Sequence, residues 1–289
     1  MKAALLGDNI GPSLTPAQHE IEGAALGIQY DYHRIDTGGQ KLSGAALEGI
    51  LADAEKMGLV GLNVTHPHKS AVVDFLHRLE GPAKDLETVN TIILRDGMRV
   101  GHNTDYSGFR QAVQGKIGSI KGHSVLQCGA GGAGASVALA LADLGIERLI
   151  IVDQVEQRAR DLKSKLNTLR SWLPVVTASG VEDVGFETVA GAVNCTPLGM
   201  AEHPGMVFDP WRLRPQAWVA DIVYFPRKTD FLKRARKHGC RVMDGTAMAL
   251  WQAVGAFQLL TGHAPDAERM KNALETLLAQ NIDHEKERT

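Results

Sequence analysis

Short apolar runs alternate with amphipathic stretches along most of this 289-residue chain. A run of about four to eight apolar residues between turn-forming residues is typical of a buried strand, whereas apolar residues three or four positions apart indicate a helix. In the first part of the chain the pattern predicts strands at residues 2–6, 30–35 and 59–64 and helices at 16–26, 43–57 and 70–79. A hairpin of strands 87–94 and 98–101 follows around Asp96-Gly97.

The rest of the chain has the regular alternation of an α/β protein. Strands are predicted at 124–127, 148–152, 191–194, 218–222 and 241–243. Helical stretches separate them, and parallel strands need such crossovers, so we expect a doubly wound parallel sheet. Two amphipathic helices at 246–261 and 266–281 follow the last strand, and we expect them to pack back onto the first part of the chain.

A glycine-rich stretch lies between two of these strands. After the strand at 124–127 the chain reads Gly129, Ala130, Gly131, Gly132, Ala133 and Gly134, and an alanine-rich helical pattern follows. In a dinucleotide-binding unit the first glycine permits a tight turn, the second lets a pyrophosphate approach, and the third lets helix and strand pack closely. The phosphates bind at the helix N-terminus, where unpaired N–H groups favour an anion. This context predicts a dinucleotide site rather than a structural glycine loop.

Asp153 ends the next predicted strand and indicates which dinucleotide binds. A carboxylate there can accept hydrogen bonds from both hydroxyls of the adenosine ribose, whereas a 2′-phosphate would meet a like charge. Residues 154–157 supply no positive charge, and Arg158 is the nearest basic residue. We therefore expect NAD as the cofactor, with NADP disfavoured by Asp153.

Length and the change of pattern predict two domains, because a domain usually holds about 100 to 200 residues. We expect an N-terminal α/β substrate-binding catalytic domain over residues 1–108, completed by the returning helices in 246–289. Residues 109–245 are expected to form the Rossmann-type NAD-binding domain between them.

Composition excludes several other classes of partner. A formal net charge of −2 gives no electrostatic reason to expect nucleic acid or a membrane surface. No stretch approaches the ~18 apolar residues of a membrane helix, and the N-terminal apolar run is too short for a secretory signal. The 3 cysteines are widely spaced and unlike a disulfide framework or a zinc site. We therefore expect a cytoplasmic protein, a monomer or homodimer, that binds small molecules.

Polar residues follow two predicted strands in the first part of the chain. The strand at 59–64 runs into Thr65-His66-Pro67-His68-Lys69, and the strand at 98–101 is followed by Asn103-Thr104-Asp105. Ligands bind at the carboxyl ends of strands in open α/β sheets, so these residues are candidates for a site. The spacing of the histidines, among them His19 and His102, matches no metal-binding motif, and we expect no metal.

Five separated motifs add a family resemblance. They are GLNVTHPHK at 61–69, TVNT at 88–91, GHNTDYSGF at 101–109, GAGGAGAS at 129–136 and DGTAMALWQAV at 244–254. Together they resemble the shikimate dehydrogenase family over nearly the whole chain, and the Asp153 strand end is similar to its NAD-dependent quinate/shikimate dehydrogenase branch. The chain departs from the family at Pro12, where His usually precedes Ser-x-Ser, and at Phe225, which replaces an Asn common after the family tyrosine.

The resemblance implies roles for particular residues. Lys69 and Asp105 match the catalytic pair, with Lys69 as proton donor and acceptor and Asp105 orienting it and balancing its charge. Positions that contact substrate in the family match Ser13, Thr15, Thr65, Lys69, Asn90, Asp105, Tyr224 and Gln252. Besides the glycine turn, Asp153 and Arg158, the implied cofactor positions are Thr196, Pro197, Leu198, Val223, Gly245 and Met248.

These residue types suit hydride transfer between nicotinamide and a ring carbon. Such a reaction needs one group to take or give the alcohol proton and another to stabilise the charge that develops on the oxygen. Structural alternatives exist for each candidate. Lys69 and Asp105 could form a weak surface ion pair, Ser13 and Thr15 could cap the helix after Pro16, Asn90 could be a turn residue, and Gln252 could be a solvated helix position.

The resemblance implies reversible, NAD-linked oxidation of the C3 hydroxyl of quinate or shikimate to the 3-dehydro acid. Family members with Ser-x-Thr at the position of Thr15 tend to accept quinate, so quinate is an expected substrate. One alternative is a family member that acts on aminoshikimate or a related cyclic polyol acid. Another is a nucleotide-sensing regulator without turnover, against which the presence of both Lys69 and Asp105 argues. Folate-linked dehydrogenases share the two-domain plan but lack the TVNT and GHNTD pair.

Overall fold

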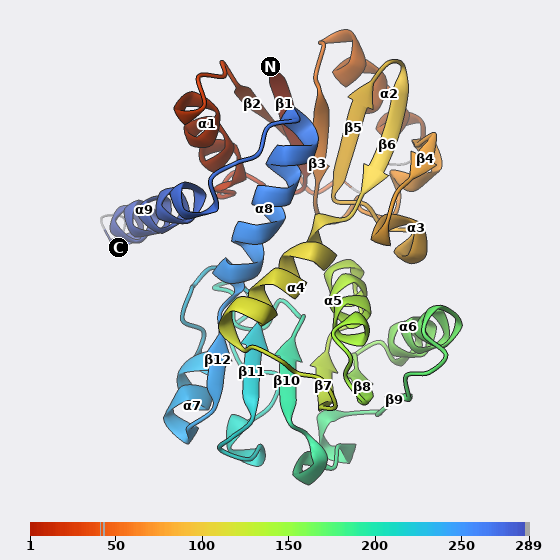
Figure 1. Ribbon diagram of the computed structural model, residues 1–289, viewed down its shortest axis with the longest axis vertical. Coiled ribbons are helices and arrows are strands. Elements are labelled where there is room, and N and C mark those ends of the chain that lie inside the picture. Colours follow the sequence, from red (N-terminus) through yellow and green to blue (C-terminus); the bar gives the residue numbers. More distant parts are fainter. Residues whose placement is uncertain (41, 43, 287–289) are drawn as a thin grey trace. The chain divides into compact units, whose positions relative to one another are not determined.

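The computed structural model describes residues 1–40, 42 and 44–286 of the chain. The chain folds into two compact units, the first formed by Met1–Thr104 and Gln252–Thr289 and the second by Asp105–Trp251. Each unit has its own six-stranded sheet with helices packed on it (Figure 1). The α/β architecture expected from the alternation of strands and helices is confirmed.

The sheet of the first unit is mixed. Its strands run in the order β2 (Asp31–Asp36), β1 (Lys2–Gly7), β3 (Gly61–Val64), β5 (Thr91–Arg95), β6 (Met98–His102) and β4 (Arg78–Leu79). β1 pairs in parallel with β2 and β3, whereas β5 is antiparallel to β3 and β6. Because β5 runs the other way, its first residue, Thr91, pairs with Asn63 near the end of β3. The TVNT motif therefore lies beside the carboxyl end of β3.

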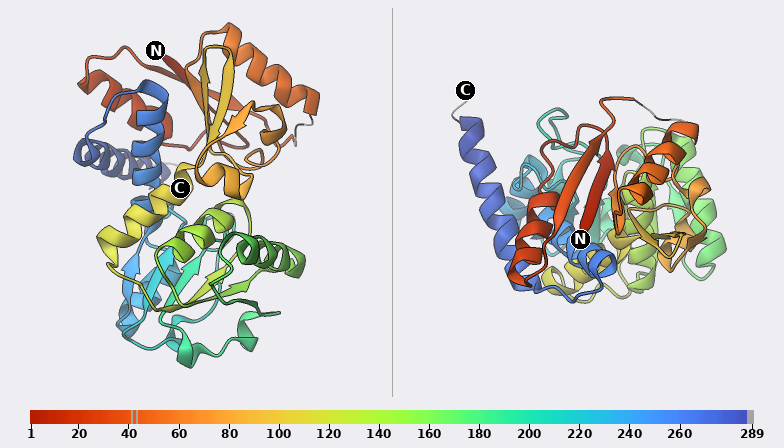
Figure 2. Two further views of the ribbon diagram at one scale, coloured as in Figure 1. Left: turned by 45° about the vertical axis from the view of Figure 1, so that its right-hand side comes forward. Right: turned by 90° about the horizontal axis from the view of Figure 1, so that it is seen from above.

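Helices α1 (Thr15–Ala25), α2 (Gly44–Lys56), α3 (Pro82–Leu86) and α9 (Ala267–Lys286) complete the first unit, together with the later turns of α8 (Gly245–Thr261). α9 packs on α1 as expected: Gln18 Nε2 donates to the Met270 carbonyl at 3.0 Å, and Arg269 Nε donates to Glu22 Oε2 at 2.7 Å. The blue C-terminal helix and the red α1 accordingly lie side by side (Figure 2).

Residues 70–79 do not form the helix that their spacing predicts. The chain instead makes a short 3-10 helix at Val73–Phe75 and then strand β4. The N–H of His77 donates to the Arg99 carbonyl at 3.0 Å, and that of Glu80 donates to the Gly101 carbonyl at 2.9 Å. Pairing with β6 thus satisfies the backbone and overrides a helical pattern that the short apolar segment supports only weakly.

The sheet of the second unit is fully parallel. Its order is β12 (Arg241–Met243), β11 (Trp218–Asp221), β10 (Gly191–Asn194), β7 (Ser124–Cys128), β8 (Arg148–Val152) and β9 (Val175–Thr177). Numbered along the chain, this is the order 3-2-1-4-5-6 of doubly wound dinucleotide-binding sheets. The strand order reverses between β7 and β10, which pair directly. Ligands bind at such a switch point, outside the carboxyl ends of the strands.

The helices of the second unit are α4 (Thr104–Lys116), α5 (Gly132–Asp143), α6 (Glu156–Leu169), α7 (Asp230–His238) and the start of α8, with 3-10 turns at Val181–Asp183, Phe186–Thr188 and Pro210–Arg212. The pattern did not predict β9, α3 or α4. The expected domain boundaries, after 108 and before 246, fall inside α4 and α8.

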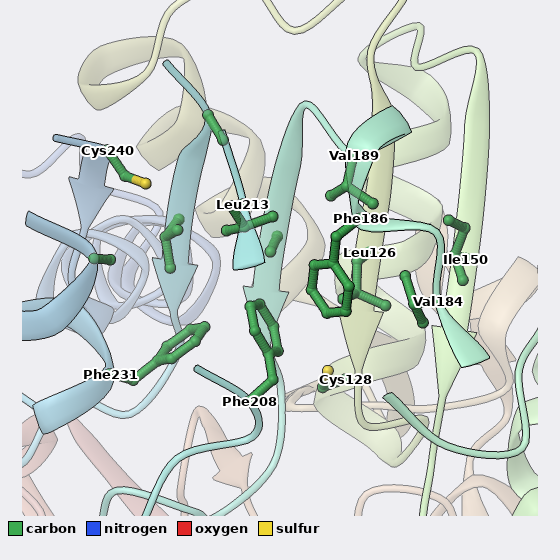
Figure 3. Packing of buried hydrophobic residues seen from close by; sticks show 14 of the residues in the cluster. Leu126, Cys128, Ile150, Val184, Phe186, Val189, Phe208, Leu213, Phe231 and Cys240 are labelled. Carbon is green, nitrogen blue, oxygen red and sulfur yellow. The ribbon is translucent and has the colours of Figure 1, made fainter. Parts of the chain in front are cut away.

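An aromatic cluster covers one face of this sheet (Figure 3). The rings of Phe186 and Phe208 are 5.0 Å apart, and those of Phe208 and Phe231 are 5.1 Å apart. They pack against strand residues such as Leu126 and Ile150, all of them buried. Burial of several large aromatic side chains stabilises the sheet. Among the described residues, no helix is long and apolar enough to span a membrane.

Candidate active site

The glycine turn after β7 has the geometry that a bound dinucleotide requires. Gly129 has a φ of +103°, and a Cβ on it would lie 2.8 Å from the carbonyl group of Cys195. A Cβ on Gly134 would clash with the Gly129 oxygen, whereas one on Gly131 would meet nothing within 4 Å. The first and third glycines are therefore needed for packing, and the second leaves the start of α5 open to a pyrophosphate.

Two side chains hold this turn. Gln127 is fully buried, and its Nε2 donates to the carbonyls of Gly129 at 2.8 Å and Gly134 at 2.9 Å. Asp153 lies at the end of β8, as predicted, where its Oδ2 accepts from the Ala130 N–H at 2.7 Å and its Oδ1 from the Val155 N–H at 2.8 Å. Each carboxylate oxygen has a further lone pair, which a ribose hydroxyl can use. Arg158 is exposed in the first turn of α6.

The loop after β10 lies across the switch point from the glycine turn, where Cys195 N donates to Cys128 O at 2.7 Å. Asn194 closes this loop. Its Oδ1 accepts from the N–H of Thr196 at 2.9 Å and from the Thr196 hydroxyl at 2.7 Å, and its Nδ2 donates to the Leu198 carbonyl at 2.9 Å. The predicted cofactor residues Thr196, Pro197 and Leu198 are thus held as one tight turn.

A buried carboxylate that the sequence did not reveal connects this loop to the next strand. Asp221 ends β11 and accepts hydrogen bonds from Asn194 Nδ2 at 2.9 Å, the Val223 N–H at 3.0 Å and the Thr229 hydroxyl at 2.7 Å. Desolvation by burial raises the pKa of Asp221 to about 6, although these hydrogen bonds lower it. The available signal was an acidic residue directly after the apolar run of β11.

The remaining predicted residues of the second unit lie directly after β11 and at the start of α8. A Cβ on Gly245 would lie 2.5 Å from the Val223 carbonyl oxygen, so only glycine lets the start of α8 approach there. Met248 is buried one turn further along α8. Tyr224 follows Val223, and 37% of its surface is exposed.

In the first unit, three of the predicted site residues lie beside the start of β5, namely Thr65, Lys69 and Asn90. The N–H of Val89 donates to the Lys69 carbonyl at 2.8 Å, and the N–H of Val64, which precedes Thr65, donates to the Asn90 carbonyl at 2.8 Å. Asn90 also binds Thr104: its Nδ2 donates to Thr104 Oγ1 at 2.9 Å, and its Oδ1 accepts from the Thr104 N–H at 2.7 Å. Val89 and Asn90 thus hold both the Lys69 main chain and the residue before Asp105.

Asp105 itself lies in the first turn of α4 and is 6% exposed. Lys69 and Thr65 are half-buried in the turns after β3. A carboxylate with so little exposure needs charged or hydrogen-bonded partners.

A buried network beneath these residues was missed by sequence reasoning. The Tyr32 hydroxyl donates to Asn63 Oδ1 at 2.5 Å, and Asn63 Nδ2 donates to Thr91 Oγ1 at 2.9 Å and to the Asn90 carbonyl at 3.1 Å. Asn63 is 4% exposed, so these bonds fix the end of β3 against β5. An asparagine inside the apolar Leu62-Asn63-Val64 run was the signal for it.

Ser13, Thr15 and Gln252 are half-buried elsewhere in the first unit. Leu14, rather than Ser13 or Thr15, is the N-cap residue of α1, and it makes no side-chain cap hydrogen bond. The Ser13 carbonyl accepts a hydrogen bond from Arg34 at 3.0 Å, which fixes the loop before α1. Gln252 lies in α8.

The part of the chain described here contains no group of three or more His, Cys, Asp or Glu residues arranged to hold a metal ion. His68 instead contacts Thr37, with 3.3 Å between Nε2 and Oγ1. His19 is fully buried against the rings of Tyr30, Tyr32 and Phe257.

The doubly wound sheet, its glycine turn and the carboxylate at the end of β8 define a dinucleotide-dependent dehydrogenase with a separate α/β unit that carries the lysine and asparagine. Residues 5–92 match the model of the shikimate dehydrogenase substrate binding domain, and residues 245–275 match that of the shikimate 5'-dehydrogenase C-terminal domain. The chain belongs to the shikimate dehydrogenase family.

Relatives resemble the chain over nearly its full length. The quinate/shikimate dehydrogenase (NAD(+)) of Corynebacterium efficiens is 43% identical over 92% of this chain and 95% of its own. The shikimate dehydrogenase (NADP(+)) of Arthrobacter sp. is 42% identical over 96% of each chain. A solved structure of quinate dehydrogenase from Corynebacterium glutamicum in complex with NAD has a TM-score of 0.88 at 42% identity and covers 96% of this chain.

Proposed function

We propose that this chain catalyses the reversible, NAD-dependent oxidation of the C3 hydroxyl of quinate or shikimate to 3-dehydroquinate or 3-dehydroshikimate. The observation that carries the proposal is the arrangement at the start of β5, where Val89 binds the Lys69 main chain and Asn90 binds the residue before Asp105. The similarity to quinate/shikimate dehydrogenases supports the choice of substrate.

The cofactor assignment rests on Asp153, because identities of 43% and 42% to NAD(+) and NADP(+) relatives do not separate the two. The Ala130 and Val155 amides hold the Asp153 carboxylate at the end of β8, where it would face the ribose of a bound dinucleotide. The residues that would hold NAD are the glycine turn for the pyrophosphate, Asp153 for the ribose, and Thr196, Pro197, Leu198, Val223, Gly245 and Met248 for the nicotinamide half. When bound there, NAD would supply the acceptor for the hydride of the carbinol carbon.

In the direction of oxidation, Lys69 Nζ, in its neutral amine form, takes the proton of the C3 hydroxyl as the C–H hydride leaves and the C=O bond forms. Asp105 orients the amine and balances the charge of the ammonium that results. In the direction of reduction, the ammonium of Lys69 returns the proton to the carbonyl oxygen.

Ser13, Thr15, Thr65, Asn90, Tyr224 and Gln252 are the proposed contacts to the substrate carboxylate and hydroxyls. Neutral hydroxyl and amide groups suit this role, because each unpaired buried polar group costs about 1 to 3 kcal/mol. Quinate is the expected substrate because family members with Ser-x-Thr at the position of Thr15 tend to accept it, although one methyl group, worth about 1 to 3 kcal/mol in selectivity, can act either way. We also infer that the protein works in the reducing cytoplasm, as a monomer or homodimer, which size-exclusion chromatography with light scattering would decide.

The proposal is tested with a matrix of quinate, shikimate and aminoshikimate against NAD and NADP, followed at 340 nm. We expect turnover of quinate or shikimate with NAD and a lower kcat/KM with NADP. Turnover of aminoshikimate alone would instead support the alternative of a family member that acts on aminoshikimate. Binding of NAD without turnover of any of the three acids would favour a nucleotide-sensing regulator.

A further inference from the structure

Asp221 occupies a position between the two loops that carry the proposed nicotinamide-side residues. It ends β11, and none of its surface is exposed. One oxygen, Oδ1, accepts from Asn194 Nδ2 at 2.9 Å and from the Val223 N–H at 3.0 Å. The other, Oδ2, accepts from the Thr229 hydroxyl at 2.7 Å. A single carboxylate therefore contacts groups from β10, from the segment after β11 and from the start of α7.

Two of these contacts lead to segments with proposed ligand contacts, and the third leads to the start of α7. Asn194 holds Thr196 and Leu198 with the rest of its side-chain amide. Val223 directly precedes Tyr224, and Gly245 packs on its carbonyl. Thr229 caps α7 by accepting from the Leu232 N–H, and its side chain packs near Gly199, which has a φ of +105°.

A buried carboxylate is costly in this environment, as the raised pKa of about 6 shows. An apolar residue would fill the same space without that cost, but it would leave the Asn194 amide, the Val223 N–H and the Thr229 hydroxyl unpaired. The position therefore requires a side chain that accepts these three hydrogen bonds, and packing alone does not explain an aspartate there.

We propose that Asp221 is a positioning residue for the nicotinamide half of the cofactor, which it sets through Asn194 and Val223 without touching the ligand. This inference rests on the proposed NAD-dependent function. The adenosine half is held elsewhere, by the glycine turn and Asp153. A ligand with nicotinamide and a ligand without it can therefore be used to examine the two parts of the site separately.

The test compares two substitutions by calorimetric titration of NAD and of ADP-ribose, which lacks nicotinamide. In Asp221→Asn the Oδ1 acceptor remains, and the new Nδ2 can donate to Thr229 Oγ1, so NAD affinity should stay within about threefold of the wild type. In Asp221→Leu the three donors lose their acceptor, and NAD affinity should fall by about tenfold or more while ADP-ribose affinity is unchanged. The KM for NAD should rise with it.

Ser124→Ala is the matched control, because Ser124 is buried in β7 of the same sheet and its hydroxyl has no hydrogen-bond partner among the described residues. Equal losses of NAD and ADP-ribose affinity in Asp221→Leu would overturn the proposal in favour of a general loss of structure. Unchanged NAD affinity in that variant would also overturn it. Since both titrations are independent of turnover, a failure of the proposed substrate assignment leaves this test readable.

Discussion

The side-chain amide of Asn90 binds Thr104 twice, through Nδ2 to Oγ1 at 2.9 Å and through Oδ1 to the main-chain N–H at 2.7 Å. Asn90 is 3% exposed, and its carbonyl and Oδ1 also bind the Asn63 and Thr91 side chains. This asparagine therefore fixes the start of α4, in addition to its proposed contact with substrate.

We predict that Asn90→Ala lowers kcat by about tenfold or more and also raises the KM for the acid substrate, because Asp105 loses the support of Thr104. NAD affinity should not change. Steady-state kinetics at saturating NAD measure both parameters. A rise in KM with kcat preserved would show that Asn90 only binds substrate.

Lys69→Ala should lower kcat by about 10²-fold or more, which is the usual effect of losing a proton-transfer group. The Kd for NAD should change little. Single-turnover kinetics with quinate would separate this step from product release. An effect confined to KM would assign Lys69 to binding alone.

Asp105→Asn should likewise impair turnover, because the amide keeps the shape of the side chain but cannot balance the ammonium of Lys69. The pH–rate profiles of the variant and the wild type are the measurement. Full activity of Asp105→Asn at every pH would contradict the proposed pairing.

Acid should destabilise the first unit through His19. Its ring is fully buried among aromatic rings, which lowers its pKa to about 3 from 6.5, an effect that the nearby Ala253 backbone only partly offsets. In this range the unfolded chain binds a proton that the folded chain excludes, so the contribution of His19 to stability is constant above pH 6.5 and falls as pH drops from 6.5 towards 3. At about pH 4.5 the loss should reach roughly 2.7 kcal/mol, since one pH unit is worth about 1.36 kcal/mol.

His19→Phe removes this proton while keeping a ring of similar size. The free energy of unfolding should be measured in urea at about pH 7.5 and about pH 4.5. At the lower pH the wild type should lose stability through His19, and the variant should avoid most of that loss. The control is His33→Gln, because His33 is exposed on β2. Parallel curves for wild type and His19→Phe at both pH values would rule out this origin of acid sensitivity.

Gln127 gives a prediction for the glycine turn. Because its Nε2 binds the carbonyls of Gly129 and Gly134, Gln127→Leu should loosen the turn and raise the KM for NAD by about tenfold with kcat nearly unchanged. Both NAD and ADP-ribose affinity should fall, in contrast to Asp221→Leu. Unaltered ADP-ribose binding would show that the turn keeps its shape without Gln127.

The sequence predicted those parts of the molecule in which a local pattern and a backbone requirement coincide. The parallel sheet of the second unit followed from regular alternation, and the glycine turn from the spacing of glycines such as Gly129, where a side chain does not fit. The hairpin around Asp96-Gly97 followed in the same way, since both residues have positive φ.

Features that depend on distant partners were not predictable. Residues 70–79 have helical spacing, but pairing with β6 draws them into the sheet. Asn63, Asn194 and Asp221 matter because they bind residues that are distant in the sequence. Asn63 binds the Asn90 carbonyl and Asn194 binds Asp221, and each pair is 27 residues apart along the chain. A single sequence carries no record of such pairs, so each looked like an isolated polar residue at a strand end.

Asp153 supports the prediction with the clearest physical basis. Its carboxylate is fixed by the Ala130 and Val155 amides at the end of β8, so it cannot swing away to admit a 2′-phosphate without breaking two hydrogen bonds. Glu156 adds a second negative charge nearby, although it pairs with Arg160 at 2.7 Å. A repulsion of a few kcal/mol corresponds to discrimination of about 10² or more, because each 1.4 kcal/mol is a factor of ten.

The wild type should therefore show a kcat/KM for NAD at least about 10² above that for NADP at saturating acid substrate. Asp153→Ser combined with Gln154→Arg should shift the preference towards NADP, because the carboxylate is removed and a guanidinium is placed in the exposed turn before α6. Asp153→Ser alone is the control, and we expect it to weaken NAD without gaining NADP, since it also releases the Ala130 amide. Equal or better use of NADP by the wild type would refute the assignment. A double variant that still prefers NAD would show that the selectivity lies outside this turn.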